Sequence, residues 1–231
     1  MEKNDKPMSK DDITKPLGSP KLEGRTRLMI AVPSRDVWRS DFGMSLAAMT
    51  ACTVNELPFL DLIFNNAKGC SLAMNRIKLC EDAVNNHCDY ILFLDDDMRV
   101  PMHTVLMFLK RQVDIIACNC ARKEIPPRPT ARGFDNGYVQ TSQESTGLEK
   151  VKSVGTGIMM INCAVFANIS TPWFCEDPVK KIGEDVWFCN QARDAGYDIH
   201  IDHDLSKDVA HIGEFEYTLQ LANEFRDRED D

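Results

Sequence analysis

Three consecutive aspartates, Asp95, Asp96 and Asp97, follow an apolar run of five residues, Tyr90–Leu94. A continuous apolar run of this length predicts a strand buried on both faces, as in a parallel sheet. The carboxylates then lie where the strand leaves the sheet at its carboxyl end, which is where open α/β sheets bind ligands. Adjacent carboxylates raise one another's pKa unless a cation lies near them, and a hard divalent ion with oxygen ligands supplies that cation. The triplet therefore predicts a Mn²⁺ or Mg²⁺ site.

The alternating direction of side chains along an extended segment separates the three carboxylates into two groups. In an extended segment Asp95 and Asp97 point to one side and Asp96 points to the other. We therefore expect Asp95 and Asp97 to face the metal ion. The alternative is a solvated acidic turn that caps the next helix, but a turn needs one aspartate rather than three behind a buried strand.

A second carboxylate pair, Glu184 and Asp185, follows Gly183 at the predicted start of a helix that ends at Gly196. Asp185 shares one face with Phe188, so it is placed to look into a cleft from the first turn. A carboxylate within hydrogen-bond reach of a hydroxyl can act as its general base. The alternative is an N-cap, or an anion that the helix dipole favours. Burial would raise the pKa of Asp185 and the helix N-terminus would lower it, and the sequence leaves that balance open.

The segment Gly155-Thr156-Gly157 stands directly before an apolar strand at 158–161. Glycines at such a position indicate that the backbone packs closely against another group. A substrate contact and a β-bulge or tight bend are both open interpretations.

The elements that must position these groups alternate between strand and helix as far as residue 112. That order predicts a parallel sheet with right-handed crossovers, and we expect one α/β domain with a mostly parallel central sheet and flanking helices. Residues 121–150 are rich in proline, arginine and turn residues, which predicts an excursion over the active face. The expected strands are 28–32, 57–64, 90–94, 114–118 and 197–201, the expected helices are 42–53, 71–86, 101–111 and 163–168, and 65–69 is an expected loop.

Composition limits the class of protein. The chain has 231 residues, 43% of them hydrophobic, and a net charge of -9, which argues against nucleic acid as a partner. The nine cysteines show no CxxC pair and suit free thiols in a reducing compartment. We expect a flexible leader at 1–24, a folded domain at 25–220 and a charged tail at 221–231. No secretory signal or integral membrane segment is expected, so the protein is interpreted as cytoplasmic.

Four landmarks in this order resemble a known family. They are Leu94-Asp95-Asp96-Asp97, Val154-Gly155-Thr156-Gly157, Gly183-Glu184-Asp185 and Ala210-His211-Ile212-Gly213. Together they are similar to nucleotide-diphospho-sugar glycosyltransferases of the GT-A fold, especially the compact enzymes of phages, bacteria and large viruses. The resemblance covers about residues 25–215. It implies a Rossmann-like GT-A domain.

The resemblance also implies roles for individual residues. The triplet corresponds to the DXD motif, in which Asp95 contacts the ribose, the metal or a metal-bound water and Asp97 ligates the metal. His211 resembles the histidine that completes the metal site. His200 and His203 have no such landmark and are expected at the surface. The implied donor-binding residues are Pro33, Ser34, Arg35, Asn75, Arg76, Asp95 and Asp96, the implied sugar or acceptor contacts are Gly155, Thr156, Gly157 and Trp173, and the implied metal ligands are Asp95, Asp97 and His211.

One position departs from the family pattern. The segment Ser71–Arg76 is similar to the family's A-R-N helix, but Met74 stands where arginine is frequent. Arg76 and Arg35 are the candidates to replace that contact.

The implied function is a metal-dependent transfer of sugar from a nucleoside-diphosphate sugar to an acceptor hydroxyl, with inversion. Asp185 resembles the catalytic base and Glu184 is the alternative or an acceptor-orienting neighbour. A glycan, a lipid-linked molecule or a protein remain open as acceptors. A nucleotidyltransferase, a sugar-nucleotide hydrolase and a non-catalytic sugar-nucleotide-binding domain are the competing hypotheses.

Overall fold

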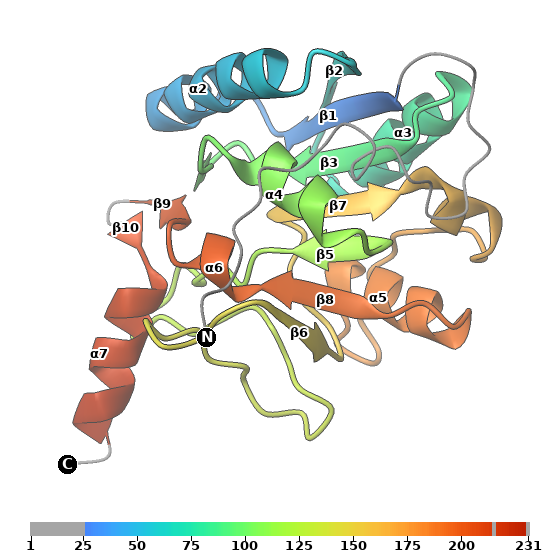
Figure 1. Ribbon diagram of the computed structural model, residues 1–231. Coiled ribbons are helices and arrows are strands. Elements are labelled where there is room, and N and C mark those ends of the chain that lie inside the picture. The colour runs from blue at the N-terminus through green and yellow to red at the C-terminus, as the bar shows by residue number, and fades with distance from the viewer. Residues whose placement is uncertain (1–25, 214–215, 230–231) are drawn as a thin grey trace, which may run out of the picture.

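A computed structural model describes residues 26–213 and 216–229, so the expected leader at 1–24 lies outside the described residues. A seven-stranded sheet in the order β2-β1-β3-β7-β5-β8-β6 forms the centre of the molecule (Figure 1). Its strands are β1 (Thr26–Ser34), β2 (Leu60–Lys68), β3 (Tyr90–Leu94), β5 (Ile115–Ala117), β6 (Leu148–Val151), β7 (Ile158–Asn162) and β8 (Ile199–Asp202). The helices are α2 (Ser40–Glu56), α3 (Leu72–Asn85), α4 (Thr104–Arg111), η1 (Cys163–Ala167, a 3₁₀ helix), α5 (Glu184–Asp194), α6 (His203–Ser206) and α7 (Leu219–Glu229).

The sheet is mostly parallel, as predicted. Strand β1 pairs in parallel with β2 and β3, and β5 pairs in parallel with β8. Strand β7 lies antiparallel between β3 and β5, and β6 is antiparallel to β8. The register pairs Leu94 with Ile158, so the start of β7 lies beside the carboxyl end of β3. This places the segment before β7 next to the aspartate triplet.

Helices cover both faces of the sheet, and each face has its own core (Figure 1). Apolar residues of α3, η1 and α5 pack on one face, and those of α2, α4 and α6 pack on the other. Strand β3 lies between the two cores, and its residues Ile91 to Leu94 are all fully buried. The continuous apolar pattern of this strand follows from having two covered faces.

An aromatic cluster supports the start of α5 from below. The rings of Phe174 and Phe188 stack with their centroids 4.9 Å apart, and Phe93 of β3 contacts Phe174 edge-on at 5.7 Å. Phe188 and Phe174 are almost completely buried. The cluster fixes the height of α5 above the sheet, and therefore the position of the carboxylates in its first turn.

A small second sheet brings the late histidine to the triplet. It has the order β10-β9-β4, with β4 (Met98–Arg99), β9 (Ala210–Ile212) and β10 (Glu216–Tyr217). The antiparallel pairing of β4 with β9 sets Met98 opposite His211. Because β4 follows the triplet directly, this register places His211 beside Asp97.

Two expectations about local structure are wrong. Residues 65–68 belong to β2 rather than to a loop, because β2 pairs with β1 as far as Lys68 and the side chains of Asn65 and Asn66 find partners in Asp82 and Ser34. The expected tail at 221–231 begins inside α7, where Ala222 is buried and Asn223 donates a hydrogen bond to the carbonyl of Thr141.

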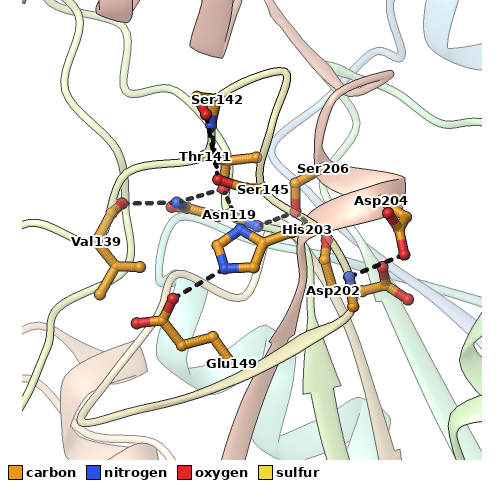
Figure 2. A network of polar contacts seen from close by, with 11 residues as sticks. Asn119, Val139, Thr141, Ser142, Ser145, Glu149, Asp202, His203, Asp204 and Ser206 are labelled. Carbon is orange, nitrogen blue, oxygen red and sulfur yellow. Dashed lines mark hydrogen bonds and ion pairs between the residues drawn. The ribbon is translucent and has the colours of Figure 1, made fainter.

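His203 is buried rather than exposed, because both ring nitrogens have partners (Figure 2). Its Nδ1 lies 2.9 Å from the hydroxyl of Thr141, and its Nε2 lies 2.9 Å from Oε2 of Glu149. Asn119 donates to the carbonyl of Val139 in the same network. The network fixes residues 139–149 against the sheet and lies apart from the aspartate triplet. His200 is partly buried.

Phe188→Ala is expected to lower the free energy of unfolding by about 3–5 kcal/mol, because it removes a buried stacked ring and leaves a cavity. Phe134→Ala is the matched control, since that ring is 59% exposed, and it should change the free energy by less than about 0.5 kcal/mol. Denaturant unfolding measures both values. Equal losses in the two variants would contradict the assignment of Phe188 to the core.

Candidate functional site

Two neighbouring cavities open at the carboxyl edge of the sheet. The first, of about 430 Å³, is lined by the loop after β1, the loop before α3 and all three aspartates of the triplet. The second, of about 320 Å³, is lined by the first turn of α5, the segment before β7 and part of the 121–150 excursion. Leu72, Asp95 and His211 line both cavities. The predicted residues therefore gather around one divided site.

The residues expected from the sequence are divided between the two cavities. The first cavity contains Pro33, Ser34, Arg35, Asn75, Asp95 and Asp96 of the expected donor-binding set, together with Asp97. The second cavity contains Gly155, Thr156, Gly157, Glu184 and Asp185 of the expected catalytic and acceptor sets, and also Arg76. We call them the nucleotide-side cavity and the acceptor-side cavity, after the roles that the resemblance implies for their residues.

Backbone hydrogen bonds hold the triplet to its neighbours in space. The N–H of Asp95 donates to the carbonyl of Gly157 at 2.9 Å, and the N–H of Ile212 donates to the carbonyl of Asp97 at 2.7 Å. The N–H of Met98 donates to the carbonyl of Asp95 at 3.1 Å, so the triplet forms a turn. Three of the four landmarks are thus connected through the main chain.

Asp97 lies between a lysine and a histidine side chain. Its Oδ1 is 3.2 Å from Nε2 of His211, and Lys123 of the excursion contacts its Oδ2. Burial raises the pKa of Asp97, but the hydrogen bonds from His211 and Lys123 outweigh burial and hold the pKa at about 2. Asp97 therefore remains an anion throughout the physiological range.

The ring of His211 is oriented by a backbone contact. Its Nδ1 lies 3.1 Å from the carbonyl oxygen of Ala121, which can accept only from a protonated nitrogen. Nε2 is then the nitrogen that faces Asp97, and loss of its proton would free its lone pair for a metal ion. A backbone carbonyl on one ring nitrogen and a metal on the other is the arrangement that histidine ligands usually adopt.

The described residues contain no cluster of three or more histidine, cysteine or acidic side chains in a ready metal-binding arrangement. Asp97 and His211 fit as a pair of ligands, and their carboxylate and imidazole suit Mn²⁺. Asp95 is separated from that pair, because its Oδ1 lies 2.8 Å from the guanidinium of Arg76. Any divalent ion here would need oxygen ligands from outside the protein, such as phosphate or water.

Asp96 is the least compensated member of the triplet. Burial raises the pKa of Asp96, and the charges of Asp97 and Asp95 raise it further. Its carbonyl accepts a hydrogen bond from the N–H of Arg39 at 3.3 Å, so the segment after β1 is connected to the triplet.

The start of α3 fixes one wall of the nucleotide-side cavity. Ser71 caps the helix by accepting a hydrogen bond from the N–H of Met74. Asn75 donates to the carbonyl of Ser34 at 3.2 Å and to that of Gly69 at 3.3 Å, so it holds two loops together. A Cβ on Gly69 would lie 2.9 Å from the Asn75 amide oxygen, so this close approach requires glycine.

The carboxylates of α5 have different partners. Glu184 contacts the guanidinium of Arg76, whereas Oδ1 of Asp185 accepts the N–H of Val186 at 2.7 Å. Burial raises the pKa of Asp185, and the adjacent charge of Glu184 raises it further. The balance that the sequence left open therefore favours burial over the helix N-terminus.

The glycines before β7 pack closely against two residues that line the acceptor-side cavity. A Cβ at position 155 would lie 3.2 Å from Thr130, and one at position 157 would lie 3.5 Å from Oδ2 of Asp95. Thr156 is 2% exposed, and its hydroxyl oxygen has no hydrogen-bond partner among the described residues. The segment is thus a closely packed wall rather than a phosphate loop.

Trp173 does not line either cavity. It packs against the core, with its ring 4.9 Å from that of Phe166. Its expected contact with sugar or acceptor has no support in this geometry. The residue that sequence reasoning missed is Lys123, which reaches Asp97 from the excursion. Its signal was a basic Arg122-Lys123 pair within a segment expected to cross the active face of an acidic chain.

Comparison with solved structures identifies the fold, whereas no model of a protein family and no curated protein matches the sequence. The crystal structure of A197 from STIV aligns with a TM-score of 0.53 and 16% identity over 81% of this chain and 86% of that one. A mutant β-1,4-galactosyltransferase 7 from Drosophila, in complex with manganese, UDP-Gal and xylobiose, aligns with a TM-score of 0.52 and 16% identity over 81% and 71%. The chain has the GT-A fold.

The GT-A assignment agrees with the topology and with the expectation from the four landmarks. A UDP-glucose pyrophosphorylase complexed with UDP-glucose aligns at a TM-score of 0.45 with 13% identity, over 87% of this chain and 81% of that one. Within the part of the chain that the structure describes, no helix combines the length and apolar character needed to cross a bilayer.

Asp185→Asn is expected to raise the melting temperature at about pH 7, and the gain should shrink toward zero as the pH falls to about 3. The folded state has the higher pKa at Asp185, so ionisation of this side chain costs stability above the ordinary aspartate pKa and costs nothing below it. The asparagine amide oxygen can keep the bond from Val186. Calorimetry across this pH range measures the difference, and a gain that does not depend on pH would contradict the assignment.

Proposed function

We propose that the protein is a metal-dependent glycosyltransferase that moves a sugar from a nucleoside-diphosphate sugar to an acceptor hydroxyl with inversion. The observation that carries the proposal is the pair of cavities that meet at Asp95 and His211. One cavity contains the loop after β1 and the triplet, and the other contains a buried carboxylate with a raised pKa. A donor lying across this boundary would place its leaving group on one side and its reacting carbon on the other.

The donor's nucleoside fits the nucleotide-side cavity. Pro33, Ser34 and Arg35 supply backbone and side-chain contacts for a base, and the triplet lies at the far end of the same cavity. Oδ2 of Asp95 is the carboxylate oxygen that Arg76 leaves unbound, so it is suited to a ribose hydroxyl or a metal-bound water. The diphosphate would then lie at Asp97 and His211.

Asp97 and His211 are the residues that would hold a Mn²⁺ or Mg²⁺ ion, with Asp95 at its outer side. A divalent cation bound there would neutralise the charge that develops on a diphosphate leaving group. Lys123 contacts Asp97 from the acceptor side, so its ammonium is placed to approach the same phosphates.

Asp185 acts as the general base in this proposal. The acceptor oxygen attacks the anomeric carbon, its proton passes to the Asp185 carboxylate, and the bond from that carbon to the diphosphate oxygen breaks with its electron pair. Attack from the acceptor-side cavity, opposite the diphosphate, inverts the configuration at carbon. The raised pKa of Asp185 brings the carboxylate closer to the basicity that a proton acceptor needs.

All nine cysteines are free thiols, which supports the proposal that the protein works in a reducing compartment such as the cytoplasm. The galactosyltransferase neighbour is complexed with UDP-Gal, so UDP-sugars are the first donors to test. A panel of UDP-, GDP- and dTDP-sugars with and without Mn²⁺ identifies the donor by thermal shift and by product. Release of free sugar without acceptor dependence would indicate a hydrolase, and release of pyrophosphate would indicate a nucleotidyltransferase.

Asp97→Ala is expected to abolish the Mn²⁺-dependent part of UDP binding, because it removes the carboxylate of the ligand pair. Titration calorimetry with UDP, with and without Mn²⁺, measures this directly. Asp198→Ala is the matched control, since this carboxylate lies at the surface in an ion pair with Lys150, and it should bind as the unmodified protein does. Binding that is unchanged in Asp97→Ala would refute the metal role.

Asp185→Asn is expected to leave UDP binding intact while sugar transfer falls by roughly 10²–10⁴-fold, the scale of the loss of a general base. The asparagine is nearly isosteric and cannot accept the acceptor proton. Initial rates with the donor selected in the panel give the loss in kcat. A turnover close to that of the unmodified protein would exclude Asp185 as the base.

A further inference from the structure

A buried arginine connects the two cavities. One guanidinium nitrogen of Arg76 lies 2.8 Å from Oδ1 of Asp95, and the other terminal nitrogen contacts Oε1 of Glu184. The Arg76 side chain is 2% exposed, and those of Asp95 and Glu184 are 25% and 14% exposed. Arg76 therefore joins the triplet on β3 to the first turn of α5.

This position is unsuited to a direct role in donor binding, for which Arg76 was a candidate. Both terminal nitrogens already have carboxylate partners, and the side chain lines the acceptor-side cavity rather than the nucleotide-side one. A guanidinium remains charged at all relevant pH values, and its planar fork can hold two carboxylates in a fixed relation. A charge buried this far from water needs such partners.

The bridge makes the two adjacent carboxylates of α5 unequal. Glu184 is bound to a permanent cation, whereas Asp185 accepts the backbone N–H of Val186 and lines the same cavity. A carboxylate held by a guanidinium through a charge-assisted hydrogen bond loses freedom to move toward a substrate hydroxyl. The carboxylate that keeps this freedom is Asp185.

We propose that Arg76 is a positioning residue that holds Glu184 against Asp95 and thereby reserves proton transfer for Asp185. The proposal rests on the proposed function, because it assigns the proton-accepting role between the two carboxylates of that site. It also gives a role to a side chain that lines the acceptor-side cavity and not the nucleotide-side one. Without Arg76, Glu184 is a second, uncompensated anion next to the base and in the path of the acceptor.

The experiment compares Arg76→Met, Glu184→Gln and the double variant, with UDP-Gal and Mn²⁺ as the first probe and the other nucleotide sugars of the panel after it. Arg76→Met should lower kcat by about tenfold or more, while the KM for the donor changes by less than about threefold. Glu184→Gln should lower kcat by less than about fivefold, because Glu184 is not the base. The double variant should recover most of the kcat that Arg76→Met loses, because the uncompensated anion is gone.

Arg111→Met is the matched structural control. Arg111 also bridges two carboxylates, Asp202 and Asp204, but it lines neither cavity. It should lower the melting temperature and leave kcat as it is, and this separates loss of a buried ion bridge from loss of positioning. UDP binding with Mn²⁺ is measured for every variant, so that a folding defect is recognised.

Two results with the variants would overturn the proposal, and one result with the unmodified protein would overturn the proposed function on which it rests. A loss of about 100-fold or more in Glu184→Gln would make Glu184 the base while leaving the glycosyltransferase function standing. A double variant no more active than Arg76→Met would show that Arg76 does not act through Glu184. If Arg76→Met fails to fold, the result with Glu184→Gln still decides between the two carboxylates. If the unmodified protein turns over no donor in the panel, the proposed function fails and the bridge is purely structural.

Discussion

The constraint on which this site depends is the compensation of negative charge at one edge of the sheet. Asp95, Asp96, Asp97, Glu184 and Asp185 all line the two cavities, and none of them is fully exposed. Carboxylates brought together in a partly desolvated place cannot all remain ionised without cations. The chain supplies two cations and a histidine from three directions, with Arg76 from α3, Lys123 from the excursion and His211 from β9. The carboxylates that receive least compensation, Asp96 and Asp185, are those whose pKa is raised.

The sheet topology makes this convergence possible. Strand β3 delivers the triplet at its carboxyl end, and β7 enters antiparallel from the same edge, so that Gly157 accepts the N–H of Asp95. The pairing of β4 with β9 then places His211, which lies more than a hundred positions later in the sequence, next to the triplet. Main-chain hydrogen bonds set these positions, so the side chains need little further ordering to face one another. A site built on such rigid elements can hold its geometry closely.

The parts of this arrangement that the sequence predicted are those with a local pattern. The apolar run before three aspartates predicted a buried strand with an acidic end, and alternating strands and helices predicted the mostly parallel sheet. The late histidine was found through a resemblance to a family and not through its spacing. The sequence could not reveal the partner of Arg76, because Glu184 lies 108 residues away and the pair has no local signature. Trp173 was assigned to substrate through the resemblance, but its ring lies beside Phe166 and packs against the core. Likewise His203 was expected at the surface because it had no landmark, while Thr141 and Glu149 satisfy both of its nitrogens in the interior.

A crystal structure of the protein with UDP and Mn²⁺, with data collected for the anomalous signal of manganese, tests the metal site most directly. One anomalous peak is expected next to Asp97 and His211, with the uridine in the cavity lined by Pro33, Ser34 and Arg35. Uridine diphosphate bound in that cavity with no manganese at Asp97 and His211, or a nucleotide bound elsewhere on the molecule, would contradict this expectation.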